Sequence, residues 1–201
     1  MRIQCSHFQL EVVEVAYSTV ASMPGPHSRP QRPSQSETHF SLRDLNQLAL
    51  SQENTELTTE VVEQWASSQG VQVEKALSRG NVGFLLAERN QVEDLNWWNR
   101  HNVGFALDVT GVNSQPFSYP KGKQSAHWAI AYARDRETGL DEVLPSILMA
   151  LSQGTNVVVH CEHSFHRGPV ALCAVLRRLF GLDVGESTLI PTWRGKGNWS
   201  R

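Results

Sequence analysis

NVVVHCEHSFHRGPV, residues 156–170, is the segment from which the architecture of this chain is most readily inferred. Its first five residues, dominated by valine, have the length and β-branched content of a strand buried on both faces of a sheet. An apolar helix pattern follows from Pro169 to Phe180, and Gly181 stands where a helix-ending glycine is expected. A buried strand therefore runs through a short polar loop into a helix.

The rest of the chain repeats this alternation of strands and helices. Apolar runs at 82–86, 103–109 and 127–133 predict three more strands, and residues 91–101 and 140–152 have helical spacing. Strands separated by helices imply a parallel sheet covered on both faces. We therefore predict an α/β fold of three layers, with a mostly parallel central sheet flanked by helices.

The N-terminal third has a different composition. Residues 22–39 are rich in proline, serine, glutamine and arginine, which is typical of a linker. Ser41 is a plausible N-cap for a helix, and a second short helix is expected at about 58–70. The predicted organisation runs from an N-terminal segment of unknown role through a linker and a helical extension to a main domain and a tail: 1–21, 22–39, 40–70, 71–182 and 183–201.

The overall composition excludes several classes of protein. The formal net charge is −2, so the chain as a whole is not a basic nucleic-acid binder. Three cysteines (Cys5, Cys161 and Cys173) are too few and too far apart for a disulfide scaffold. No stretch approaches the roughly 20 apolar residues of a membrane helix. Since no targeting segment is recognisable, we expect a cytoplasmic or nuclear protein with no membrane partner.

The loop between residues 160 and 167 has the composition of an anion-binding nucleophile site. Backbone N–H groups at the start of a helix point at one spot, and a phosphate-sized anion fits there. Arg167 adds a guanidinium fork for two phosphate oxygens. Cys161, at the base of the loop, stands in a field that favours the thiolate. The expected chemistry is attack of this thiolate on phosphorus, followed by hydrolysis of the cysteinyl-phosphate.

Two further interpretations concern the neighbours of this loop. A leaving alkoxide needs a proton, and Asp135, which follows the strand predicted at 127–133, is the candidate acid; Glu137 and Asp141 are the alternatives. His160, Cys161, His163 and His166 also resemble a metal-ligand cluster, but zinc sites usually draw ligand pairs from two separated segments. No second pair is evident, so we expect no metal and no other cofactor.

The pattern His-Cys-x5-Arg, between a valine-rich strand and a helix, resembles the signature of the protein tyrosine and dual-specificity phosphatase superfamily. The resemblance covers about residues 71–182 and implies a dual-specificity-phosphatase-like fold. It implies that Cys161 is the nucleophile, Arg167 the phosphate clamp, His160 the residue that orients the loop and Asp135 the general acid. The remaining phosphate-loop residues would be Glu162, His163, Ser164, Phe165, His166 and Gly168. The implied activity is hydrolysis of phosphomonoesters on phosphotyrosine and phosphoserine/threonine proteins.

Two positions depart from the family pattern. Ser164 replaces a glycine of the phosphate cradle, and Gly168 replaces a serine or threonine whose hydroxyl helps the departing thiolate. We therefore expect slow breakdown of the intermediate. In the limit, the chain would be a degenerate phosphatase that binds phosphate without efficient turnover.

The same loop resembles in part that of the RNA 5′-triphosphatases of this superfamily. His163 and Phe165 match that version better than a typical protein phosphatase, and those enzymes do not depend on an aspartic acid donor. The expected partner is thus a phosphorylated protein or another phosphomonoester, and nucleic acid only if the RNA alternative holds.

Overall fold

The computed structural model describes most of the chain between residues 38 and 184. The described ranges are 38–52, 58–72, 81–111, 114, 117–130, 139–163 and 167–184, with no side-chain description for Thr38. The elements, in chain order, are β1 (Thr38–Ser41), α1 (Leu42–Ser51), α2 (Thr58–Ser68), β2 (Gly83–Ala87), α3 (Arg89–Val92), α4 (Leu95–Arg100), β3 (Val103–Asp108), β4 (Gln124–His127), α5 (Leu140–Ser152), β5 (Asn156–His160) and α6 (Arg167–Phe180).

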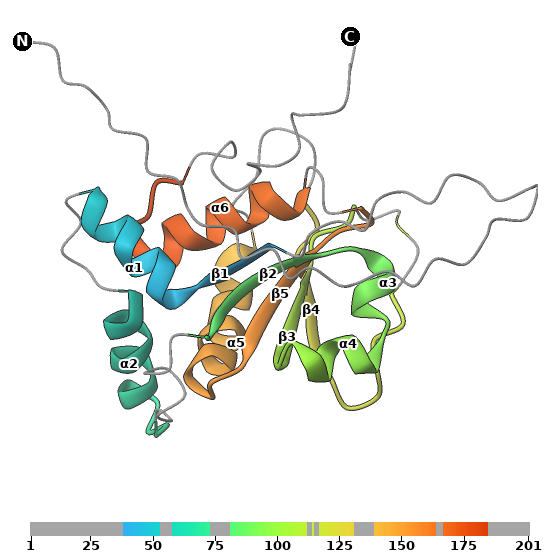
Figure 1. The fold of residues 1–201 in the computed structure, drawn as a ribbon, viewed down its shortest axis with the longest axis horizontal. Helices are drawn as coiled ribbons and strands as arrows, with labels where there is room; N and C mark the ends of the chain where they lie inside the picture. Colours follow the sequence, from blue (N-terminus) through green and yellow to red (C-terminus); the bar gives the residue numbers. More distant parts are fainter. Residues whose placement is uncertain are drawn as a thin grey trace, which may run out of the picture. The chain divides into compact units, whose positions relative to one another are not determined.

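A five-stranded sheet forms the middle layer, in the order β1-β2-β5-β3-β4 (Figure 1). β2, β5, β3 and β4 run parallel to their neighbours, and only β1 is antiparallel, at the edge beside β2. β5 is therefore central, as its burial at all five positions requires. The predicted α/β class with a mostly parallel sheet is confirmed.

Helices cover both faces of the sheet. Alternate residues of β5 point to opposite sides, so Val157 and Val159 join one apolar core while Val158 joins another. The larger core lies under α1, α2, α5 and α6, and the smaller one under α3 and α4 (Figure 1). The three-layer arrangement follows directly from this alternation.

The residues expected as a helical extension share this sheet and core. Ser41 ends β1 and caps α1, with its Oγ accepting from the Asp44 N–H and the Asp44 carboxylate accepting from the Ser41 N–H. α1 buries Leu42, Leu45 and Ala49 in the larger core. The predicted N-cap and helix are confirmed. The boundaries proposed for the N-terminal segment, the linker and the tail fall on or beside residues outside the described ranges and stay predictions.

Two local predictions were wrong. The helix expected at 91–101 is two short helices, α3 and α4, because Asp94 breaks the first and caps the second by accepting from the Asn96 N–H at 2.8 Å. The strand expected at 127–133 is instead β4, at 124–127; residues 128–130 form no strand, and 131–133 lie outside the described ranges. β4 is an exposed edge strand held by backbone pairing with β3, so its sequence carries no apolar pattern. Trp128 and Ile130 are buried core residues outside any strand.

The helix predicted at 140–152, the strand predicted at 156–160 and the helix predicted at 169–180 are confirmed as α5, β5 and α6. α5 includes Pro145 close to its start, and α6 ends before Gly181, whose φ of 66° is the left-handed conformation that glycine adopts readily. Within the described residues, none of the helices is both long and apolar enough to pass through a bilayer.

Candidate active site

The candidate site lies where the parallel strands end together. Pairing places Ala87 of β2 and Asp108 of β3 on either side of His160, the last residue of β5. His127 ends β4 opposite Asp108. The loops that leave these strands therefore meet at one edge of the sheet, which is where ligands bind in open parallel sheets.

Cys161 follows the central strand at this edge. It is a free thiol with 6% of its surface exposed, and it directly succeeds the fully buried β5. Three residues of the loop, 164–166, lie outside the described ranges. The chain resumes at Arg167, the first residue of α6, and the next two residues, Gly168 and Pro169, are buried. Cys161 and Arg167 thus bracket one short loop between the central strand and a helix N-terminus.

Arg167 reaches across to the neighbouring strand. A Cβ built on Gly111, in the loop after β3, would lie 3.4 Å from each terminal guanidinium nitrogen of Arg167. The guanidinium therefore lies against the backbone of that loop. A guanidinium at this edge of the sheet can bind an anion through paired N–H groups.

His160 supports the loop from below. Its side chain is fully buried, its Nε2 lies 2.8 Å from the Tyr119 hydroxyl, and its ring meets the Phe117 ring edge-on at 4.6 Å between centroids. Burial lowers the pKa of His160 to about 4, so the imidazole is neutral at physiological pH. Burial also raises the pKa of Tyr119, which keeps its hydroxyl protonated. The ring orientation of His160 is thus fixed by a hydrogen bond and aromatic packing.

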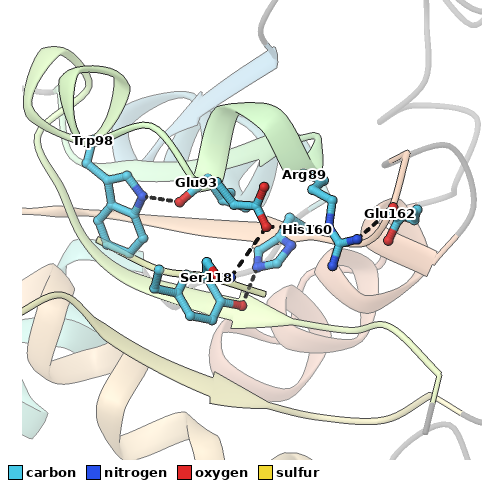
Figure 2. Close-up of polar contacts among 8 residues, drawn as sticks. Arg89, Glu93, Trp98, Ser118, His160 and Glu162 are labelled. Atoms are coloured by element: carbon cyan, nitrogen blue, oxygen red, sulfur yellow. Dashed lines mark hydrogen bonds and ion pairs between the residues drawn. The ribbon is translucent and has the colours of Figure 1, made fainter. Parts of the chain in front are cut away.

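Glu162 is tied to the turn after β2. The backbone N–H of Arg89 donates to the Glu162 carbonyl at 3.4 Å, and its guanidinium lies 3.3 Å from a Glu162 carboxylate oxygen. Figure 2 shows Arg89 between Glu162 and Glu93, beside His160. The Arg89 guanidinium also stacks over the Phe117 ring, 4.3 Å from its centroid. The first residue after Cys161 is therefore anchored through both its backbone and its side chain.

The loop after β3 forms the other wall. Asp108 is 8% exposed and accepts a hydrogen bond from the Thr110 N–H at 2.9 Å. The Val109 N–H donates to the His160 carbonyl at 2.9 Å, and His127 Nε2 lies 3.0 Å from the Thr110 carbonyl. These contacts fix the backbone that leads to Gly111 and so to Arg167.

Some of the residues predicted for the site are in place and others are not described. His160, Cys161, Glu162, His163, Arg167 and Gly168 lie at this edge, with His163 exposed and Gly168 buried. Ser164, Phe165, His166, Asp135 and Glu137 fall outside the described ranges.

The alternative acid Asp141 is held in an ion pair. Its carboxylate is paired with Arg178, at 2.8 Å and 3.2 Å, near the C-terminal end of α6. Arg178 lies about 16 Å along that helix from Arg167, given a rise of about 1.5 Å per residue. Hydrogen bonding to Arg178 lowers the pKa of Asp141, which disfavours its acid form. The ion pair with Arg178 therefore disfavours Asp141 as a proton donor.

The structure adds Arg89, Asp108, Phe117 and Tyr119 to the site. Two of these had a usable signal in the sequence: Asp108 and Arg89 are polar residues at or just after the ends of apolar strands. Phe117 and Tyr119 had none, because they reach His160 from a loop with no fixed spacing to it. Among the described residues, no three His, Cys, Asp or Glu side chains are arranged to bind a metal ion.

Comparison with known proteins yields a likeness among solved structures. No family model matches the chain, and no curated protein matches it. It is similar to the crystal structure of a variant of human DUSP28, with a TM-score of 0.45 and 18% identity over 53% of this chain and 71% of that chain. It is also similar to a mouse putative dual specificity phosphatase complexed with zinc tungstate, with a TM-score of 0.45 and 17% identity over 58% of this chain and 70% of that chain. At this level of similarity, the site must be judged from the residues of this chain.

Proposed function

We propose that this protein is a cysteine-dependent phosphatase that hydrolyses phosphomonoesters through a cysteinyl-phosphate on Cys161. The observation that carries the proposal is the placement of Cys161 and Arg167. Cys161 directly follows the central parallel strand, and Arg167 begins the next helix with its guanidinium against the loop after β3. A strand, a short loop and a helix N-terminus in that order favour a bound phosphate at the carboxyl edge of the sheet.

The chemistry requires two displacements at phosphorus. In the first, the Cys161 sulfur forms a bond to phosphorus as the ester P–O bond breaks, and the leaving oxygen takes a proton from the acid. In the second, water attacks phosphorus and gives a proton to the carboxylate that the acid left behind, the S–P bond breaks to return the Cys161 thiolate, and inorganic phosphate leaves. Arg167 stabilises the charge on the non-bridging oxygens in both steps. His160 is neutral, so it fixes the start of the loop without itself attracting the phosphate.

Asp135 is the acid that we propose for the first step. An alkyl phosphate needs this proton far more than an activated aryl phosphate, whose leaving group is stable as an anion. Asp135→Asn should therefore slow hydrolysis of a phosphoserine peptide much more than hydrolysis of a chromogenic aryl phosphate. Equal losses on both substrates would remove Asp135 from this role and leave Glu137 to be tested in the same way.

The direct test compares the two described cysteines. Cys161→Ser should reduce hydrolysis of a chromogenic aryl phosphate by about a hundredfold or more, because a hydroxyl is a far weaker nucleophile than a thiolate. Cys173→Ser is the matched control, since Cys173 is also a buried cysteine that forms no disulfide but lies in the middle of α6. Activity that survives Cys161→Ser would contradict the proposal.

The class of substrate can be tested with the same protein. We propose phosphorylated proteins, on phosphotyrosine or phosphoserine/threonine, as the substrates. Release of phosphate from matched phosphopeptides and from 5′-triphosphorylated RNA would compare the two classes at equal concentration. Faster release from RNA would replace the protein substrate with the RNA alternative. Phosphate binding without release from either substrate would identify a binding module.

A further inference from the structure

Glu162 presents a difficulty for any anion chemistry at Cys161. Its carboxylate belongs to the residue next to the nucleophile, and a negative charge there disfavours both a thiolate and a bound phosphate. Its side chain is 42% exposed, so burial does not neutralise it. A loop that binds phosphate needs some means of compensating this charge.

Arg89 is built to provide that compensation. Ala87 pairs with His160 in the sheet, so Arg89 and Glu162 each stand two residues past that pair. Their backbones remain hydrogen-bonded there, Arg89 N–H to Glu162 carbonyl, and their side chains form an ion pair at 3.3 Å. The strand register itself therefore brings this arginine to this glutamate.

The Arg89 side chain is held in place by further contacts. Its Nε lies 3.5 Å from a carboxylate oxygen of Glu93, and its guanidinium stacks on the ring of Phe117, 4.3 Å from the centroid. Phe117 in turn packs against His160. Only 23% of the Arg89 side chain is exposed, so its charge is less screened than that of a surface arginine.

We propose, on the basis of the proposed phosphatase function, that Arg89 is a positioning residue that neutralises Glu162 and holds its carboxylate away from the phosphate. Removal of the guanidinium leaves Glu162 and Glu93 uncompensated beside the nucleophile loop. Among the described residues, the other charged and titratable groups at this edge are then Glu88, Asp108, Tyr119, His127, His160, His163 and Arg167, and Arg167 is the permanent cation of this described set.

Three variants separate a charge effect from a structural one. Arg89→Met keeps the backbone hydrogen bond and most of the packing but removes the charge; it should raise the pKa of Cys161 by about half a unit or more and raise KM about threefold or more. Glu162→Gln should shift both quantities in the opposite direction. The double variant should return both toward wild type, and the effects should shrink at high salt.

The experiment follows alkylation of Cys161 by iodoacetamide against pH in the full chain, with the modified peptide identified by mass spectrometry, alongside KM for an aryl phosphate. Thiol titration needs no turnover, so it judges the role of Arg89 even if the phosphatase proposal fails. Arg100→Met, an exposed site at the end of α4, is the matched control. If Arg89→Met does not fold, Arg89→Lys and Glu162→Gln take its place: the proposal expects a thiol pKa near wild type in the first and a lower one in the second. The proposal would be overturned if the double variant had the same thiol pKa and KM as Arg89→Met. It would also be overturned if Glu162→Gln left the thiol pKa unchanged.

Discussion

The hydroxyl of Tyr119 lies 2.8 Å from Nε2 of His160, the residue immediately before Cys161. The tyrosine remains protonated because burial raises its pKa, and the histidine remains neutral because burial lowers its own. The hydroxyl and Nε2 share one hydrogen bond, whereas Nδ1 of the same ring is buried without a partner among the described residues. A loop with no regular structure thus fixes the residue at the end of the central strand.

Tyr119→Phe should destabilise the fold through this contact. The change leaves a buried Nε2 without its partner, which costs about 1–3 kcal/mol. The free energy of unfolding, measured in urea, should fall by that amount. In a His160→Leu background the same change should cost much less, because no nitrogen is left unsatisfied. Equal costs in the two backgrounds would show that Tyr119 acts through packing alone.

The low pKa of His160 predicts a pH dependence of stability. In the unfolded chain the imidazole takes up a proton as the pH falls through its ordinary value of 6.5, whereas in the folded protein it does so only near 4. The folded state therefore loses stability as the pH falls across this window, by about 3 kcal/mol at its lower end. Urea unfolding between pH 7 and 4 should show a steeper loss for wild type than for His160→Leu. Parallel curves would contradict the assignment.

Ser41→Ala tests whether the residues before β2 contribute to the stability of the fold. Ser41 is 6% exposed and completes a capping box with Asp44 at the start of α1. Its loss should cost about 1–2 kcal/mol in urea unfolding. Ser51→Ala, at the exposed C-terminal end of the same helix, should stay within about 0.5 kcal/mol of wild type. Equal small effects would indicate that β1 and α1 are peripheral to the cooperative unit.

Substitutions at Gly111 test how closely the loop after β3 fits against Arg167. A single Cβ at this position would lie at 3.4 Å from the guanidinium, close to ordinary contact. Gly111→Ala should therefore retain most of the activity, whereas the branched side chain of Gly111→Val should displace the guanidinium and lower kcat/KM about tenfold or more. Steady-state kinetics on an aryl phosphate measures both. An unchanged kcat/KM in Gly111→Val would mean that Arg167 does not depend on its contact with this loop.

Much of the fold can be predicted from the sequence because its central elements are buried on every side. Residues 156–160 carry valines on both faces, and α6 carries an apolar stripe, so neither pattern is ambiguous. β4 could not be found in this way, because an exposed edge strand is fixed by hydrogen bonds to its neighbour and its side chains face solvent. The break at Asp94 was missed because the apolar spacing continues through it, while the capping carboxylate decides where α4 begins.

The candidate site likewise contains residues with a local signal in the sequence and residues without one. The spacing of Cys161 and Arg167 is local and can be seen in the sequence, whereas Arg89 and Tyr119 reach the loop through the sheet register and through tertiary contacts. Asp141 was a poor alternative for the acid, because sequence proximity to the predicted third strand does not reveal its pairing with Arg178. Asp135 stays a prediction, to be tested by its effect on different leaving groups.

The most direct measurement is rapid acid quenching of the full chain after mixing with a chromogenic aryl phosphate, with mass spectrometry of the peptide that contains Cys161. The mechanism predicts one phosphoryl group on Cys161, formed in a burst faster than steady-state release, because Gly168 supplies no hydroxyl to help the thiolate depart. The same label should be absent from Cys161→Ser. Turnover with no label on Cys161, or with a label on another residue, would contradict the central claim that Cys161 is the nucleophile.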